Sequence, residues 1–202
     1  IRQYGRHYKN VRSRLMGIST LISTSNITSA TSLVEITSGI DSTYDEYMFV
    51  FTDVHHDLGG SNNGNHFEFN VSTDGGTNYN VTKTTTYFDA THAEADSDAS
   101  LQYKTGYDVA QGTGYQILAG SIDSAADASA SGIFHLFSPS NTTYVTHFYA
   151  RFNVLSASPA NNTCKETNIA GYFNTTSAVN AIAFKAGVNN IDNAVIQLYG
   201  IA

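Results

Sequence analysis

The sequence predicts an all-β protein, an antiparallel β-sandwich of jelly-roll type preceded by an extended basic N-terminal arm. Three observations lead to this fold class. From Leu33 onward, apolar and polar residues alternate with a period of two, and the pattern of a helix is almost absent. Turns rich in Gly, Asn and Ser separate the runs. Charged residues make up only 13% of the 202 residues, and Ser, Thr, Asn and Gly replace them, as is common in extracellular and virion β-proteins.

The chain begins with a basic segment. Its first fourteen residues hold half of the ten Lys and Arg residues and no acid, whereas the remainder has five basic residues against 17 acidic ones. This asymmetry predicts an arm that docks on an acidic protein neighbour. Nucleic acid is disfavoured because the acidic remainder would repel a polyanion. The side chains expected to make the contact are Arg2, Tyr4, Arg6, Tyr8, Lys9, Arg12 and Arg14.

A Ser/Thr-rich stretch, "STLISTSNITSATS", follows and indicates either an extended connector or a first edge strand. We therefore assign residues 1–32 to the arm and connector, and residues 33–202 to the sandwich domain. In "HFEFNVS" the apolar residues occupy alternate positions, which is typical of a half-buried antiparallel strand. The residues predicted to form the core are Phe49, Phe51, Phe67, Phe69, Phe148 and Leu198.

Two strands are apolar on both faces. "EYMFVFTDV" shows this pattern, and "GIFHLFS" places Ile133 and Phe137 opposite Phe134 and Leu136. One sandwich has only one core, so the second face of these strands is predicted to contact another copy of the chain. The spacing of strands and turns indicates nine or ten strands, with a short helical turn possible at residues 99–102.

The last strand, within "NNIDNAVIQLYGIA", is also apolar. Terminal residues fray unless the fold holds them, so this strand is predicted to pair inside a sheet.

No pattern of catalytic residues emerges. The G-x-S-x-G, P-loop and dinucleotide motifs do not occur in the chain, and its single Cys164 excludes an intrachain disulfide. His55 and His56 are neighbours and point to opposite faces of a strand, so they cannot share a metal. The acidic run at Glu94, Asp96 and Asp98 lacks the spacing of an EF-hand. We therefore predict no catalytic residue, no metal site and no cofactor.

Two loops carry residues that suit ligand binding. "GGTNYN" contains Asn78 and Tyr79, and "GTGYQ" contains Tyr115. Tyr and Asn are compatible with sugar binding and are equally good at protein interfaces. No apolar run approaches the roughly 18 residues that a membrane helix needs, so no membrane partner is expected.

An opening "Tyr-x-x-Tyr" strand in "GIDSTYDEYMFVFTDVH", a "Ser-Thr-Asp-Gly-Gly" hairpin and a terminal "Leu-Tyr-Gly-Ile" occur in this order. In this the chain resembles β-rich structural proteins of tailed bacteriophages, especially marine ones, over about residues 33–202. The resemblance implies a non-enzymatic structural protein at the virion surface, either a capsid decoration or head fibre or a component of a tail fibre. It also implies a homotrimer whose arm contacts other virion proteins of the capsid or tail. The alternative is an adhesin of the virion that binds a host surface glycan.

Overall fold

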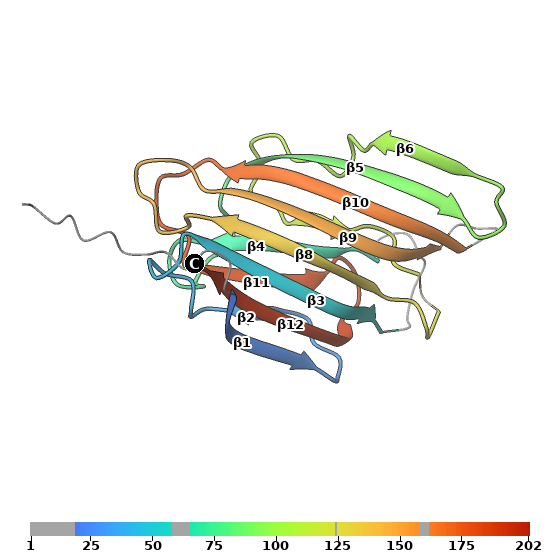
Figure 1. Ribbon diagram of the computed structural model, residues 1–202, viewed down its shortest axis with the longest axis horizontal. Helices are drawn as coiled ribbons and strands as arrows, with labels where there is room; N and C mark the ends of the chain where they lie inside the picture. Colours follow the sequence, from blue (N-terminus) through green and yellow to red (C-terminus); the bar gives the residue numbers. More distant parts are fainter. Residues whose placement is uncertain (1–18, 58–64, 124, 158–161) are drawn as a thin grey trace, which may run out of the picture.

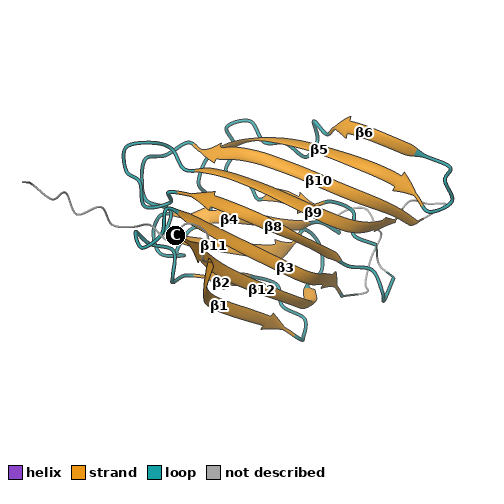
Figure 2. Cartoon of the chain, in the orientation of Figure 1, coloured by secondary structure: helices purple, strands orange, loops and turns teal. Residues whose placement is uncertain are grey.

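The computed structural model describes residues 19–57, 65–123, 125–157 and 162–202. The predicted basic arm, from Arg2 to Arg14, lies outside these residues. Within them the chain forms twelve strands and no helix (Figure 2). The strands are β1 (Ser19–Ile27), β2 (Val34–Ile36), β3 (Glu46–His56), β4 (Phe67–Ser72), β5 (Lys83–Ala93), β6 (Ala99–Tyr103), β7 (Gln116–Ala119), β8 (Ala130–Phe137), β9 (His147–Ala157), β10 (Asn162–Phe173), β11 (Ala181–Ala186) and β12 (Ile191–Ile201).

The strands form two antiparallel sheets that pack as a sandwich (Figure 1). The large sheet has the order β1-β12-β3-β8-β9-β10-β5-β6, and the small sheet has the order β2-β11-β4-β7. The predicted all-β sandwich is thereby confirmed. The structure has more strands than the sequence pattern indicates, partly because β2 has only three residues. Residues 99–102, where a helical turn was possible, belong to β6 and pair with β5.

The last strand lies inside the large sheet. β12 pairs with β1 on one side and with β3 on the other. Both sets of neighbours satisfy its backbone hydrogen bonds, which explains why the chain stays apolar to its last strand. The Ser/Thr-rich stretch supplies β1, so of the two alternatives the first edge strand is the one observed.

Phenylalanine side chains from both sheets form the core. All six residues predicted for it are at most 2% exposed. Phe69 of the small sheet meets Phe134 of the large sheet with ring centroids 4.8 Å apart, and Phe51 meets Phe184 at 5.0 Å. Edge-to-face pairs of this kind stabilise a fold by about 0.5–1.5 kcal/mol each beyond the burial of area. The period-two alternation therefore identifies the core correctly.

The small sheet covers only part of the large one. Its edge strand β7 packs against β9 and β10, while β5 and β6 continue the large sheet beyond it (Figure 1). Residues 107–112 then run along β5, where the backbone of Lys83 exchanges hydrogen bonds with Gly112. At the end of the large sheet formed by β5 and β6, the small sheet therefore does not cover the inner side.

Candidate interaction surface

The outer side of the large sheet carries a continuous group of apolar and aromatic side chains. Strand register places Tyr199 opposite Met48, Met48 opposite His135, and His135 opposite Tyr149. Phe137 follows on the same side of β8. We call these five residues the aromatic face. They alternate along their strands with buried core residues such as Phe49 and Phe134, so the two faces of β3 and β8 are both apolar, as the sequence predicts.

The rings of the aromatic face contact one another. The centroids of His135 and Tyr149 are 4.6 Å apart with an interplanar angle of 18°, and those of Phe137 and Tyr149 are 5.7 Å apart. Tyr149 is nevertheless 41% exposed. The stack thus presents a rigid, partly open aromatic surface, which is the composition found at the centres of protein interfaces.

The charged groups around the aromatic face are paired with each other. His135 Nδ1 lies 2.5 Å from Glu46 Oε1, and Arg151 Nε lies 2.7 Å from Glu166 Oε1. Hydrogen bonds donated by Arg151 and Asn168 lower the pKa of the Glu166 carboxyl. Each of these carboxylates already has a partner within the same chain. A second protein that covered this face would therefore not bury an unpaired carboxylate.

Of the predicted ligand loops, the first is a tightly bonded turn. The side chain of Asn78 donates to Asp74 Oδ2 at 2.7 Å, and its backbone N–H donates to Asp74 Oδ1. Bonds from Ser72 and Asn78 lower the pKa of Asp74 to about 2. Gly75 and Gly76 take positive φ values of 75° and 93°, so the chain turns where Asp-Gly-Gly predicts. The predicted hairpin is wrong, however, because the flanking strands β4 and β5 lie in different sheets and do not pair. Asn78 therefore serves the turn.

Tyr79 and Tyr115 do come together, on the outer side of the small sheet. Burial and the nearby Glu35 carboxylate raise the pKa of both phenols. Lys185 Nζ lies 4.6 Å from the centroid of the Tyr115 ring and 3.7 Å from a Glu68 oxygen. The structure thus unites two of the three predicted loop residues in a small polar and aromatic cluster.

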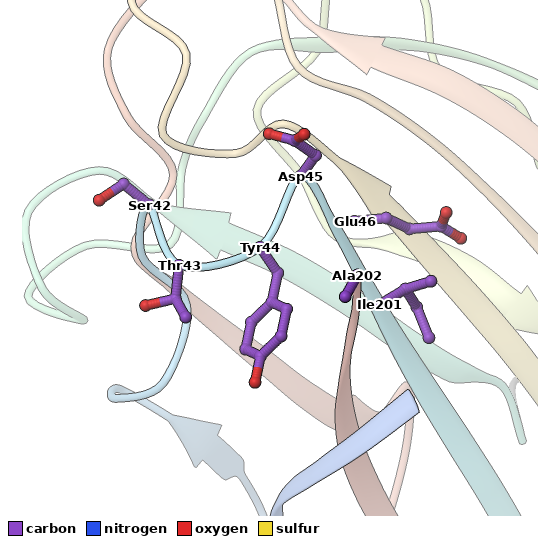
Figure 3. A pocket seen from close by; sticks show the side chains of 7 residues that line it. All are labelled: Ser42, Thr43, Tyr44, Asp45, Glu46, Ile201 and Ala202. Atoms are coloured by element: carbon purple, nitrogen blue, oxygen red, sulfur yellow. The ribbon is translucent and has the colours of Figure 1, made fainter. Parts of the chain in front are cut away.

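A further pocket lies between the first and the last of the sequence segments that resemble phage proteins, "Tyr-x-x-Tyr" and "Leu-Tyr-Gly-Ile". It has a volume of about 610 Å³ and is lined by residues 42–46 and by Ile201 and Ala202 (Figure 3). The Tyr44 ring lies so close to Gly200 that a Cβ there would be 2.5 Å from Tyr44 Cγ. Tyr47 Oη donates to the backbone carbonyl of Asp41 at 2.9 Å. The "Tyr-x-x-Tyr" and "Leu-Tyr-Gly-Ile" segments are therefore packed together, a contact that sequence reasoning missed.

The histidine and carboxylate candidates stay apart. His55 Nδ1 lies 2.6 Å from Asp192 Oδ1, while His56 points inward and is 2% exposed. Burial first, and then the neighbouring His55, lowers the pKa of His56 to about 4. Asp96 contacts His92 at 3.2 Å in the acidic run. Among the residues that the structure describes, no three His, Cys, Asp or Glu side chains come close enough to hold a metal ion.

Comparison with known proteins identifies no family for this chain. Neither the protein-family models nor the curated protein sequences match this chain. In the described part of the chain, no helix is long and apolar enough to cross a membrane.

Proposed function

We propose that this chain is a non-enzymatic structural protein of a tailed-phage particle, exposed at the virion surface as a capsid decoration, a head fibre or a part of a tail fibre. The observation that carries the proposal is the aromatic face. A stack of His135, Phe137 and Tyr149 on the outer side of a fully formed sandwich has no role in the chain's own core. Its composition suits burial against a neighbouring subunit in an assembly.

We propose the jelly roll as the topology. Without β5, β6, β9 and β10, the large sheet reduces to β1-β12-β3-β8 and faces β2-β11-β4-β7. Consecutive strands such as β1 and β2, or β3 and β4, then lie in opposite sheets. This order supports two rolled four-stranded sheets with two inserted hairpins that widen one of them.

The proposed attachment is through the basic arm. Ser19, the first described residue, pairs with Ile201 at the end of β12, so the described chain begins beside the pocket of Figure 3. An acidic surface on another virion protein would complement the five basic residues of the arm, which are Arg2, Arg6, Lys9, Arg12 and Arg14. The number of copies that share the aromatic face is proposed to be three, by the resemblance to phage proteins.

The second candidate function is glycan binding by a virion adhesin. The cluster of Tyr79, Tyr115 and Lys185 favours it, because aromatic rings beside a charged donor suit a sugar ring and its hydroxyls. This cluster is on the small sheet and the aromatic face is on the large one, so the two functions use separate surfaces.

Incorporation into particles tests the structural proposal. Phage producing a chain that lacks residues 1–18 should form particles without this protein, whereas a Val188→Asp chain, altered at an exposed loop position, should be incorporated normally. Quantitative mass spectrometry of purified particles measures both. Normal incorporation of the truncated chain would remove the arm from the proposal, and absence of the intact chain from purified particles would reject the structural role.

A further inference from the structure

The inward side chains of the large sheet are apolar opposite the small sheet and include charged residues beyond it. In the middle of the sandwich the inward side chains of β8 and β9 are Phe134, Phe148 and Phe152. On β5 and β10 the inward positions near this end include Asp89 and Lys165, both at most 8% exposed. Charged residues are rarely buried so deeply without a specific role.

These residues line a pocket of about 380 Å³. β5 and β10 supply its floor, and the end of β6 with the following turn supplies one wall. The residues that matter for its chemistry are Asp89, Lys104, Tyr107, Ser121 and Lys165. The volume is at the lower end of the range for sites that hold a small molecule.

Two lysines interact electrostatically with one carboxylate, that of Asp89, in this pocket. Lys104 Nζ lies 3.7 Å from Asp89 Oδ1, and its hydrogen bond goes instead to Gln102 Oε1 at 2.6 Å. Lys165 Nζ donates to the carbonyl of Gly120 at 3.0 Å. Burial lowers the pKa of Lys165, Asp89 opposes that shift, and repulsion from Lys104 adds to it, so the two ammonium groups act on each other.

The Asp89 carboxylate itself is buried and unsatisfied. Neither of its oxygens accepts a hydrogen bond from the described residues, although its side chain is only 1% exposed. The Tyr87 hydroxyl beside it is buried and unpaired in the same way, and burial, with the charge of Asp89, raises the pKa of that phenol. Native proteins seldom leave such groups unpaired without a functional reason. Asp89 therefore interacts electrostatically with both lysines and accepts a hydrogen bond from neither.

The mouth of the pocket is aromatic. Tyr103 is opposite Phe88 in the register of β5 and β6, so its ring points to the outer side of the sheet, and its hydroxyl donates to Asp108 Oδ2 at 2.7 Å. Tyr107 packs edge-on against Tyr87 with centroids 5.2 Å apart, and its hydroxyl lies 3.4 Å from Ser121 Oγ. A flat ring that enters here would meet tyrosine on its apolar side and hydroxyl and ammonium donors further in.

We propose that this pocket binds an acidic saccharide, a sugar ring that carries one carboxylate. The carboxylate contacts Lys104, which is the more accessible of the two lysines, with Lys165 adding its charge from below. The ring lies against Tyr107, and Ser121 bonds a ring hydroxyl. One carboxylate matches the single positive charge left by Lys104, Lys165 and Asp89, the charged residues that line the pocket. A phosphate monoester, with about 1.5–2 negative charges at neutral pH, would exceed it.

The test compares two sugars that differ in charge. Methyl glucuronide and methyl glucoside are titrated into the full chain by isothermal calorimetry. We expect saturable binding of the glucuronide with a dissociation constant of about 1 mM and binding of the glucoside weaker by about tenfold or more. Equal affinity for the two sugars, or no saturable binding of the glucuronide at tens of millimolar, would overturn the proposal.

Two substitutions sharpen the test because they act in opposite directions. Lys104→Gln should weaken glucuronide binding by about tenfold, while Asp89→Asn, which removes the competing carboxylate, should strengthen it. Arg151→Gln is the control, since it removes a positive charge from the outer side of the large sheet, where Arg151 is paired with Glu166 at 2.7 Å. An equal loss in Lys104→Gln and Arg151→Gln would contradict the assignment. If Asp89→Asn does not fold, the comparison of Lys104→Gln with Arg151→Gln still decides.

The result is independent of the assembly proposed above. The pocket is on the inner side of the large sheet and the aromatic face is on its outer side. Failure of sugar binding leaves the packing of subunits unaffected, and a monomeric chain would still be expected to bind the glucuronide.

Discussion

Phe69 lies where the two sheets meet, and its removal should destabilise the fold strongly. Its ring is fully buried and contacts Phe134, Phe148 and Phe173 at centroid distances of 4.8, 5.1 and 6.3 Å. Phe→Ala substitutions in cores cost roughly 3–5 kcal/mol. The contacts come from three strands of the opposite sheet, β8, β9 and β10, which cannot collapse together into the space. We therefore expect Phe69→Ala to lower the free energy of unfolding by about 4 kcal/mol.

Urea unfolding followed by circular dichroism measures this loss, at one protein concentration because assembly shifts the apparent stability. Phe88→Ala is the matched control. It is on β5 but 41% exposed on the outer side, so the expected loss is below about 1 kcal/mol. A loss for Phe69→Ala under about 2 kcal/mol, or one equal to that of Phe88→Ala, would refute the position of Phe69 at the centre of the core.

Three further predictions concern pH, close packing and salt. Because the folded state holds His56 neutral, with a pKa of about 4 against 6.5, stability should fall by about 3 kcal/mol as the pH drops from 6.5 to 4. His56→Gln should flatten that slope in urea titrations, and an unchanged slope would contradict the burial of His56. Gly200→Ala should cost about 1–3 kcal/mol through its clash with Tyr44, and adding Tyr44→Ala should relieve most of that cost in a double-mutant cycle; purely additive losses would argue against the contact. Binding of the chain to particles that lack it should weaken as salt concentration rises, and salt-independent binding would speak against an electrostatic arm.

Local patterning predicts the core and the turns well. Alternation in "HFEFNVS" is sufficient to bury Phe67 and Phe69, and Asp-Gly-Gly is sufficient to specify the turn at Gly75 and Gly76, although not the hairpin, since the chain passes there from one sheet to the other. The double-sided apolar pattern around Phe134 also predicts an apolar outer face correctly. These features depend on residues that are close together in the chain, so the sequence displays them directly.

The polar pocket could not be predicted in this way. Asp89 and Lys165 alternate along their strands like any polar residue that faces solvent, and only the order of the strands reveals that they point inward. That order places β5 beside β10 and beyond the small sheet, although their sequences are separated by four other strands. The contact between Tyr44 and Gly200 likewise joins distant segments. Long-range topology, rather than local pattern, decides which polar residues share a site.

The mass of the full chain in solution tests the central claim, that the aromatic face is buried between copies. Sedimentation equilibrium at micromolar concentration should give about 65 kDa, three times the chain's 21.8 kDa. Tyr149→Asp, which introduces a charge into the face, should reduce the mass to that of one chain. Val188→Asp, at a loop position that is 42% exposed against 41% for Tyr149, should not. A single species of 21.8 kDa for the unaltered chain, or an assembly that Tyr149→Asp leaves intact, would contradict the account.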